Sequence, residues 1–315
     1  MGITVAFLGQ KEARKHFGKV GTQSDIHLHD LAEGGVEITS IVADRYPEKV
    51  QGISYSLTGC DAAVLVVDAV GPALGEQILA ADAAGITHGV IVLVNYVQPD
   101  AIKPLVDGTS LQQWLVVEDD FAAARAHLAA AKPVHREGCT MVVIDHAFNV
   151  KGVGAVILGV VRRGTVRKSE TLHAWPDRVI CPVRSIQVHD VDKSEASQGD
   201  RVGLALRGTN PEQLDRGLVL APADADLVAH KAGSKVRVEL SRSRFARQEL
   251  QVGSVIHLGF GMQFTPLRLD TAPPAAGQTA MVEGTIDKAI VVVAGERGIA
   301  WHLDAKQRLL GRVTI

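Results

Sequence analysis

The order in which apolar segments follow one another along the chain most constrains its fold. Up to Lys132, short apolar runs typical of buried strands alternate with stretches that have the length and spacing of helices. The predicted strands cover 3–9, 36–42, 62–68, 89–95 and 114–118, and the predicted helices cover 46–57, 74–84 and 119–131. Because strands that alternate with helices usually pair in parallel, this part predicts a doubly wound α/β domain.

A different pattern begins after Lys132, where Pro133 and Gly138 interrupt the chain and few helices remain plausible. The predicted strands here cover 140–146, 154–162, 179–189 and 201–207, then, after a break at 221–226, 235–240, 254–260, 263–269, 280–284, 290–293, 298–303 and 309–315. Residues 162–164 read as a hairpin turn. Regular short strands favour closed barrels, so we predict an α/β domain over 1–132 and β-barrels over 133–225 and 226–315.

Charge and cysteine content narrow the class of protein. The formal net charge is −2, but residues 1–136 carry 10 Lys and Arg against 16 Asp and Glu, whereas the rest carries 23 against 19. This distribution permits contact with nucleic acid without requiring it. The three cysteines are widely spaced, which suits reduced thiols, and no apolar stretch is long enough to span a membrane. We therefore expect a cytoplasmic protein.

The loop after the first strand lies where nucleotide-binding proteins hold phosphate. A phosphate loop of the G-x-x-x-x-G-K-[ST] type has four residues between its glycines and a hydroxyl after the Lys for Mg²⁺. Here residues 10–17 separate Gly9 from Gly18, and Val20 stands in the place of the hydroxyl. The loop is therefore too long and lacks one expected ligand.

The same loop allows a weaker anion site. The candidates are Gly18, Lys19, Gly21 and Thr22, because a lysine and glycine amides at a helix N-terminus suit an anion. The alternative interpretation is structural: Phe17 packs inward, and the glycines bend the chain back towards the sheet. The residues alone leave both open.

Paired histidines at positions 27 and 29 would lie on one side of an extended strand, a spacing that can bind a metal when further ligands arrive from elsewhere. No partner cluster is evident in the sequence. We therefore expect solvent-facing residues here, and no metal site.

The second part of the chain carries a family resemblance. The segments 152–166, 183–187, 199–208 and 214–220 resemble the second domain of translational GTPases of the elongation factor Tu type. The resemblance is strongest to the selenocysteine-specific elongation factor and its archaeal relatives, and it spans nearly the whole chain. It implies a GTPase-like first domain followed by two β-barrels, with GTP or GDP and Mg²⁺ as cofactors and tRNA as partner.

Each nucleotide motif of that family departs from its pattern in this sequence. Where the family has Asp-x-x-Gly, Asp44 remains but Pro47 replaces the glycine, and proline has no N–H to offer a phosphate. Where the family has Asn-Lys-x-Asp, Asn95 remains but Tyr96 and Gln98 replace the residues that recognise guanine. The sequence thus predicts a vestigial nucleotide site formed by Gly9, Gly18, Lys19, Gly21, Thr22, Asp44 and Asn95.

Two functions follow from these departures. The first is a protein without catalytic residues, cofactor or metal, which has lost GTP binding and hydrolysis and acts by binding tRNA, another RNA or a component of the translation machinery. The alternative is a divergent but active GTPase that uses GTP and Mg²⁺ and rebuilds its site from Lys19, Thr22 and Asp44. A third interpretation is a scaffold that binds only proteins.

Arginines in both predicted barrels could contact RNA phosphates. In the family, the first two domains hold the aminoacyl end of tRNA and the third contacts its stem. The candidates are Arg162, Arg163, Arg242, Arg244 and Arg247. Such contacts position a nucleic acid without reading its sequence. We expect RNA or the translation machinery as partner, and neither DNA nor a membrane; a solvated barrel surface is the alternative.

Overall fold

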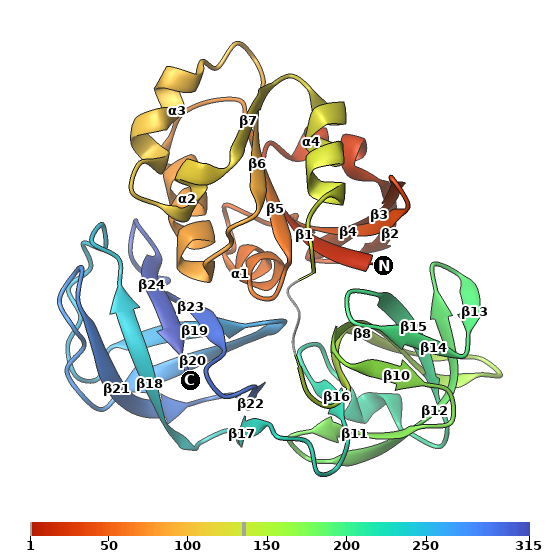
Figure 1. The fold of residues 1–315 in the computed structure, drawn as a ribbon. Coiled ribbons are helices and arrows are strands. Elements are labelled where there is room, and N and C mark those ends of the chain that lie inside the picture. The colour runs from red at the N-terminus through yellow and green to blue at the C-terminus, as the bar shows by residue number, and fades with distance from the viewer. Residues whose placement is uncertain (1, 134–136) are drawn as a thin grey trace. The chain divides into compact units, whose positions relative to one another are not determined.

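The computed structural model describes residues 2–133 and 137–315, with only the backbone of Thr22 and Gln23 (Figure 1). It divides into two compact units. The larger unit contains residues 3–132, 233–288 and 295–315, and the smaller contains 133–232 and 289–294 together with the N-terminus. The larger unit thus joins the α/β region to the last barrel. The exact boundaries proposed at 132 and 225 remain predictions.

A seven-stranded sheet forms the centre of the α/β region, in the order β2-β3-β4-β1-β5-β6-β7. The strands are β1 (Gly2–Gly9), β2 (Lys19–Gln23), β3 (Ile26–Glu33), β4 (Val36–Ala43), β5 (Ala62–Val67), β6 (Gly89–Leu93) and β7 (Leu115–Glu118). The pairs β1–β5, β5–β6 and β6–β7 are parallel, as predicted. β2 and β3 are not among the strands predicted above, and β3 pairs antiparallel with β2 on one side and with β4 on the other.

Helices cover both faces of this sheet, which confirms the doubly wound class (Figure 1). They are the 3₁₀ helix η1 (Lys11–Phe17), α1 (Gln51–Leu57), α2 (Pro72–Ala84), α3 (Pro99–Val106), the 3₁₀ helix η2 (Ser110–Gln113) and α4 (Phe121–Ala129). One core cluster joins α1, α2 and α3 to one face, and another joins η1 and α4 to the other. α3 lies where no helix is predicted, and α1 begins later than predicted because residues 44–48 form a turn.

The last barrel is closed and belongs to the larger unit. Its strand order is β18-β21-β20-β19-β23-β24. The strands are β18 (Lys235–Arg242), β19 (Val255–Phe260), β20 (Gln263–Leu269), β21 (Thr279–Ile286), β23 (Arg297–Trp301) and β24 (Leu309–Thr314). Trp301 is fully buried, and its indole Nε1 donates to Ser54 Oγ of α1 at 3.3 Å. The barrel and the helices of the α/β region therefore share one core.

The smaller unit contains the other barrel. Its strands are β8 (Met141–Val150), β9 (Gly154–Arg163), β11 (Thr171–Trp175), β12 (Val179–Val188), β15 (Arg201–Leu206) and β16 (Val219–Ala221). Their ladder closes because β12 pairs with both β11 and β15. β13 (Val191–Lys193) extends the sheet beside β12, and β10 (Thr165–Arg167) pairs with β14 (Glu195–Ser197). The short 3₁₀ helix η3 (Pro211–Gln213) precedes β16.

Two local predictions in the barrels are wrong. The chain does turn at Gly164, whose φ is 66°, but β10 then pairs with β14 and not with β9, so residues 162–164 are no hairpin turn. The predicted strand 290–293 forms as β22 (Ile290–Val292), but it pairs with β17 (Val228–His230) in a two-stranded sheet outside the last barrel. Turn residues and apolar runs indicate where strands form, but they do not indicate which strands pair with one another.

A buried ion pair joins the last barrel to α2. Glu76 of α2 is 8% exposed, and it accepts hydrogen bonds from Arg308 N at 3.1 Å and Arg308 Nε at 3.2 Å. Arg308 Nη1 also donates to the carbonyl of Pro47 at 2.6 Å, and its guanidinium lies 5.7 Å from the ring centre of Tyr46. One side chain thus holds three segments of the larger unit together.

Removing the arginine should destabilise this unit, because it leaves the Glu76 carboxylate buried without its partner. We expect Arg308→Ala to lower the free energy of unfolding by about 3 kcal/mol, measured by urea denaturation. The matched control is Lys235→Ala, which removes an exposed ion pair to Asp270 and should cost less than about 0.5 kcal/mol. Equal losses in the two variants would contradict a structural role for the buried pair.

Candidate functional site

The backbone amides at the start of the loop after β1 donate hydrogen bonds to other groups of the protein. Gly9 N donates to Gln77 Oε1 of α2 at 2.6 Å, and Gln10 N donates to the carbonyl of Val66 at 3.0 Å. The Gln10 side chain then caps η1 by accepting from Ala13 N at 3.0 Å. A phosphate cradle needs such amides to point at the ligand. Here they are already satisfied by β5, α2 and the loop itself.

The expected helix N-terminus after Gly18 is wrong. η1 ends at Phe17, Gly18 follows with a φ of 128°, and strand β2 comes next, so Lys19 pairs with Asp30 in a β-ladder. A Cβ on Gly18 would lie 2.6 Å from the carbonyl oxygen of Asp30, which explains the glycine by close backbone approach. Phe17 is 1% exposed, in agreement with the structural interpretation of the loop. Gly21 also lies in β2, and the side chain of Thr22 lies outside the described residues.

Basic side chains of the chain itself lie beside Asp44. Its Oδ1 lies 2.8 Å from Arg14 Nη1 and 3.6 Å from His27 Nδ1, and its carbonyl accepts a hydrogen bond from Lys11 Nζ. Burial opposes ionisation, but the hydrogen bond from Arg14 and the nearby positive charges outweigh it, so the pKa of Asp44 lies below its usual value. The carboxylate is therefore charged and paired with protein groups.

The remaining motif positions lie in the loop after β6. Asn95 and Tyr96 follow β6 with left-handed φ values of 52° and 61°, and the Tyr96 side chain is 98% exposed. Gln98 donates from Nε2 to the carbonyl of Tyr96 at 3.2 Å, so its amide turns back on its own loop. These residues do not offer guanine the carboxylate that the family motif provides.

Three residues of this region were not indicated by any motif. The Gly9 amide donates a hydrogen bond to Gln77, and Asp44 accepts hydrogen bonds from Lys11 and Arg14. The unusual run of charges in the loop was the only signal for Lys11 and Arg14. Nothing in the sequence distinguishes Gln77 from an ordinary helix residue. The structure thus brings the loop after Gly9 to Asp44, and the contacts of both positions are made by groups of the protein.

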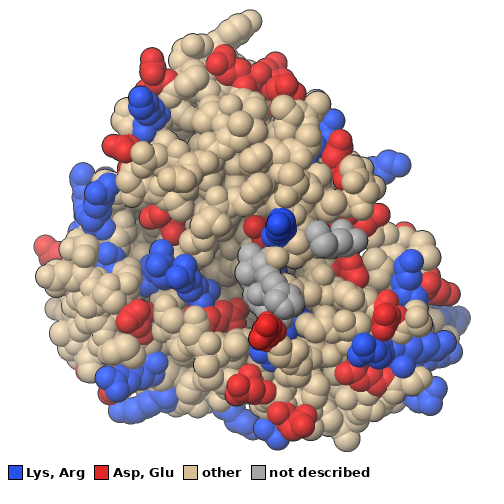
Figure 2. Space-filling view, in the orientation of Figure 1, with Lys and Arg blue, Asp and Glu red and all other residues tan. Residues whose placement is uncertain are grey.

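The candidate RNA-binding arginines separate into two groups. Arg163 is 5% exposed and donates to the carbonyl of Cys139 at 2.9 Å, and Arg242 donates to the carbonyls of Pro274 and Gln248 at 2.9 and 2.6 Å. Arg163 is thus buried and Arg242 is bound to backbone acceptors, while the RNA-binding role of the arginines stays a prediction. The other three candidates are at least partly exposed: Arg162, Arg244 and Arg247. On the face in Figure 2, described Lys and Arg side chains are interspersed with Asp and Glu.

The paired histidines His27 and His29 lie on strand β3. His29 is 1% exposed, and its Nδ1 lies 3.3 Å from the carbonyl of Gly18, so the expectation that it faces solvent is wrong. Burial lowers its pKa. Within residues 2–133 and 137–315, no group of three or more His, Cys, Asp or Glu side chains is placed to hold a metal. Over the same residues, no helix is long and apolar enough to cross a membrane.

Comparisons with known proteins agree with this architecture. Residues 154–221 match the family model described as elongation factor Tu domain 2. The chain is 31% identical over 313 residues to the uncharacterized protein MJ0325 of Methanocaldococcus jannaschii, covering 98% of each chain. It is 38% identical over 125 residues to the selenocysteine-specific elongation factor of that organism, covering 39% of this chain but only 26% of that protein.

Solved structures give the same fold. Translation elongation factor SelB from Methanococcus maripaludis, in its apo form, has a TM-score of 0.82 and 21% identity, with 100% of this chain and 79% of that chain covered. The same factor in complex with the GTP analogue GppNHp has a TM-score of 0.81 and 20% identity, with 100% and 78% covered. At this identity the likeness concerns the fold alone.

Gly9 is held in place by packing, so its substitution should be costly. A Cβ on Gly9 would lie 1.8 Å from the carbonyl oxygen of Val66, at a φ of 88°. We expect Gly9→Ala to lower the free energy of unfolding by about 3 kcal/mol, because strain and overpacking act together. The control is Gly35→Ala, which has a φ of 79° but open space around it and should cost about 1 kcal/mol. Similar urea-denaturation midpoints for the two variants would contradict this explanation.

Proposed function

This chain belongs to the translational GTPase family of elongation factor Tu type, and from that premise we propose that it acts without a GTP cycle. On this proposal, it is an elongation-factor-like protein that binds tRNA or another component of the translation machinery. It keeps the fold of its relatives and uses the barrels for binding. The proposal assigns no catalytic residue to the α/β region.

The observation that carries the proposal is that contacts within the chain occupy the nucleotide positions. The Gln77 side chain accepts the hydrogen bond of the Gly9 amide, and Arg14 forms an ion pair with Asp44. A bound nucleotide would have to displace both contacts before making its own. Phosphate binding also loses an amide at Pro47, which has no N–H. Each displaced or missing contact weakens nucleotide binding further.

The segment that follows Pro47 is also anchored to the barrel. The Pro47 carbonyl accepts from Arg308, and Thr58, just after α1, donates from Oγ1 to the carbonyl of Gly261 at 2.8 Å. In the family, this segment begins with the motif that meets the γ-phosphate. Anchoring at both ends supports a segment whose position is set by the barrel and not by a nucleotide.

A calorimetric titration tests this proposal. We expect GTP and GDP, each with Mg²⁺, to give no heat of binding, which corresponds to a Kd weaker than about 1 mM. The positive control is the Methanococcus maripaludis factor, which has been crystallised with a GTP analogue. Heat of binding that Lys19→Ala abolishes would instead support the divergent GTPase.

A second experiment tests whether the partner is tRNA. Arg162 is the partly exposed candidate on the barrel of the smaller unit. We expect a tRNA pool to bind at low salt, with the logarithm of affinity falling linearly as the logarithm of salt concentration rises. Arg162→Ala should reduce that slope by about 1, whereas Arg268→Ala, an exposed arginine of the other barrel, should leave it unchanged.

The absence of tRNA binding at low salt would remove RNA as the partner. It would leave the nucleotide result untouched, since the two titrations probe different groups. Filter binding over a range of salt concentrations provides both the affinity and the slope. A slope that does not change in either variant would assign the binding to other cations.

A further inference from the structure

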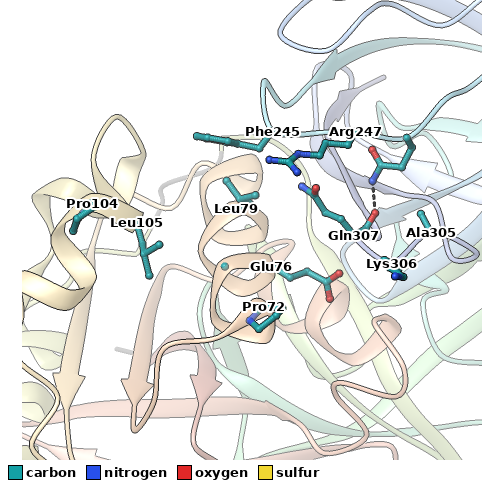
Figure 3. Close-up of a pocket in the computed structure, with 12 residues that line it drawn as sticks. Pro72, Glu76, Leu79, Pro104, Leu105, Phe245, Arg247, Ala305, Lys306 and Gln307 are labelled. Carbon is teal, nitrogen blue, oxygen red and sulfur yellow. Dashed lines mark hydrogen bonds between the residues drawn. The ribbon is translucent and has the colours of Figure 1, made fainter.

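The larger unit contains a groove of about 670 Å³ between helices of the α/β region and loops of the last barrel. Figure 3 shows α2 in the centre, with Leu105 of α3 on one side and the barrel residues Arg247, Lys306 and Gln307 on the other. All of these segments belong to the same compact unit. The groove involves none of the nucleotide motif residues.

Apolar side chains line much of the groove. Leu79 of α2 faces it, as do Leu105 and Phe245, which are 36% and 43% exposed. Pro72 and Pro104 add rigid apolar surface at the two helices. Large apolar side chains that remain exposed together in a concave surface are typical of a binding site. Their shape suits aliphatic or aromatic side chains of a ligand.

The charged residues that line the groove are one ion-paired acid and two exposed cations. Glu76 is the acidic residue among the described lining residues, and Arg308 neutralises it in the buried ion pair. Arg247 and Lys306 also line the groove, and both are exposed. Arg244, beside them, places its guanidinium 4.8 Å from the ring centre of Phe245. The free charges at this surface are therefore positive.

We propose that this groove binds a segment of a partner protein in which apolar side chains are flanked by Asp or Glu. The apolar residues would contact Leu79, Leu105 and Phe245, and the carboxylates would pair with Arg247 and Lys306. A peptide fits better than RNA, because bases stack on aromatic faces and Arg244 covers one face of Phe245, the aromatic residue among the described lining residues. This site extends the proposed function by adding a protein partner.

Selection of peptides tests the site directly. Random 12-residue peptides displayed on phage are selected against the full chain, and an enriched peptide is synthesised with a fluorescein label. We expect enriched sequences to combine acidic and large apolar residues. In fluorescence polarisation, Arg247→Glu/Lys306→Glu should weaken binding at least about tenfold, because paired charges become repulsive. Leu105→Asp should weaken it similarly, because it places a charge in the apolar floor.

The matched control is Arg268→Glu, which reverses an exposed charge on the same barrel outside the groove and should change the affinity less than about twofold. Circular dichroism confirms that each variant is folded. The proposal is overturned if no peptide is enriched, if the enriched peptides lack an excess of acids, or if the groove variants bind them unchanged.

Two further outcomes would assign the groove to another occupant. Displacement of the peptide by a tRNA pool, together with loss of tRNA binding in Arg247→Glu/Lys306→Glu, would show a nucleic-acid site. Self-association of the chain in sedimentation, abolished by the same variant, would show that a second copy fills the groove. Either result overturns the proposal, and neither depends on whether GTP binds.

Discussion

The buried pair of Glu76 and Arg308 is the interaction on which the larger unit depends. A carboxylate at 8% exposure is stable only with a partner, and that partner comes from the last barrel. Because Arg308 also donates to the Pro47 carbonyl, the same side chain fixes the turn before α1. The barrel, α2 and this turn therefore cannot separate without exposing or unpairing a buried charge. With Glu76 neutralised, the charges that remain among the described residues lining the groove are positive.

Helix α2 connects this interface to the loop after β1. Two adjacent residues of α2 make these contacts. Glu76 accepts a hydrogen bond from Arg308 of the barrel, and Gln77 accepts one from the Gly9 amide at 2.6 Å. The backbone contributes as well, because the Ala73 carbonyl accepts from Tyr46 Oη and the Ala83 carbonyl accepts from Arg312 Nε. A shift of α2 along its axis would break contacts at both ends. The geometry of the loop after β1 is thus tied to the position of the barrel.

The sequence predicts the helices and strands that have a strong apolar pattern. It does not predict the features that depend on contacts with other parts of the fold. The parallel strands and both barrels follow from regular apolar runs. The hairpin of β3 and β4 was missed although Gly34 and Gly35, both with positive φ, form the two-residue turn that favours it. α3 was missed because Pro104 lies inside it. The burial of Arg163 and the hydrogen bond between Gln77 and Gly9 depend on segments that are distant in the sequence. A local sequence pattern therefore cannot predict them.

A nucleotide switch requires two arrangements of the chain that bind the nucleotide unequally. In the larger unit, contacts from Arg308, Trp301 and Thr58 all favour one arrangement of α1 against the barrel. A second arrangement would have to replace the buried ion pair and the shared apolar core at once, which costs more than the loss of a single surface contact. A chain limited to one arrangement binds its partners at its intrinsic affinity, because no fraction of the molecules is held in an incompetent state. On the proposed function, regulation would then act through the amount of protein or partner and not through nucleotide exchange.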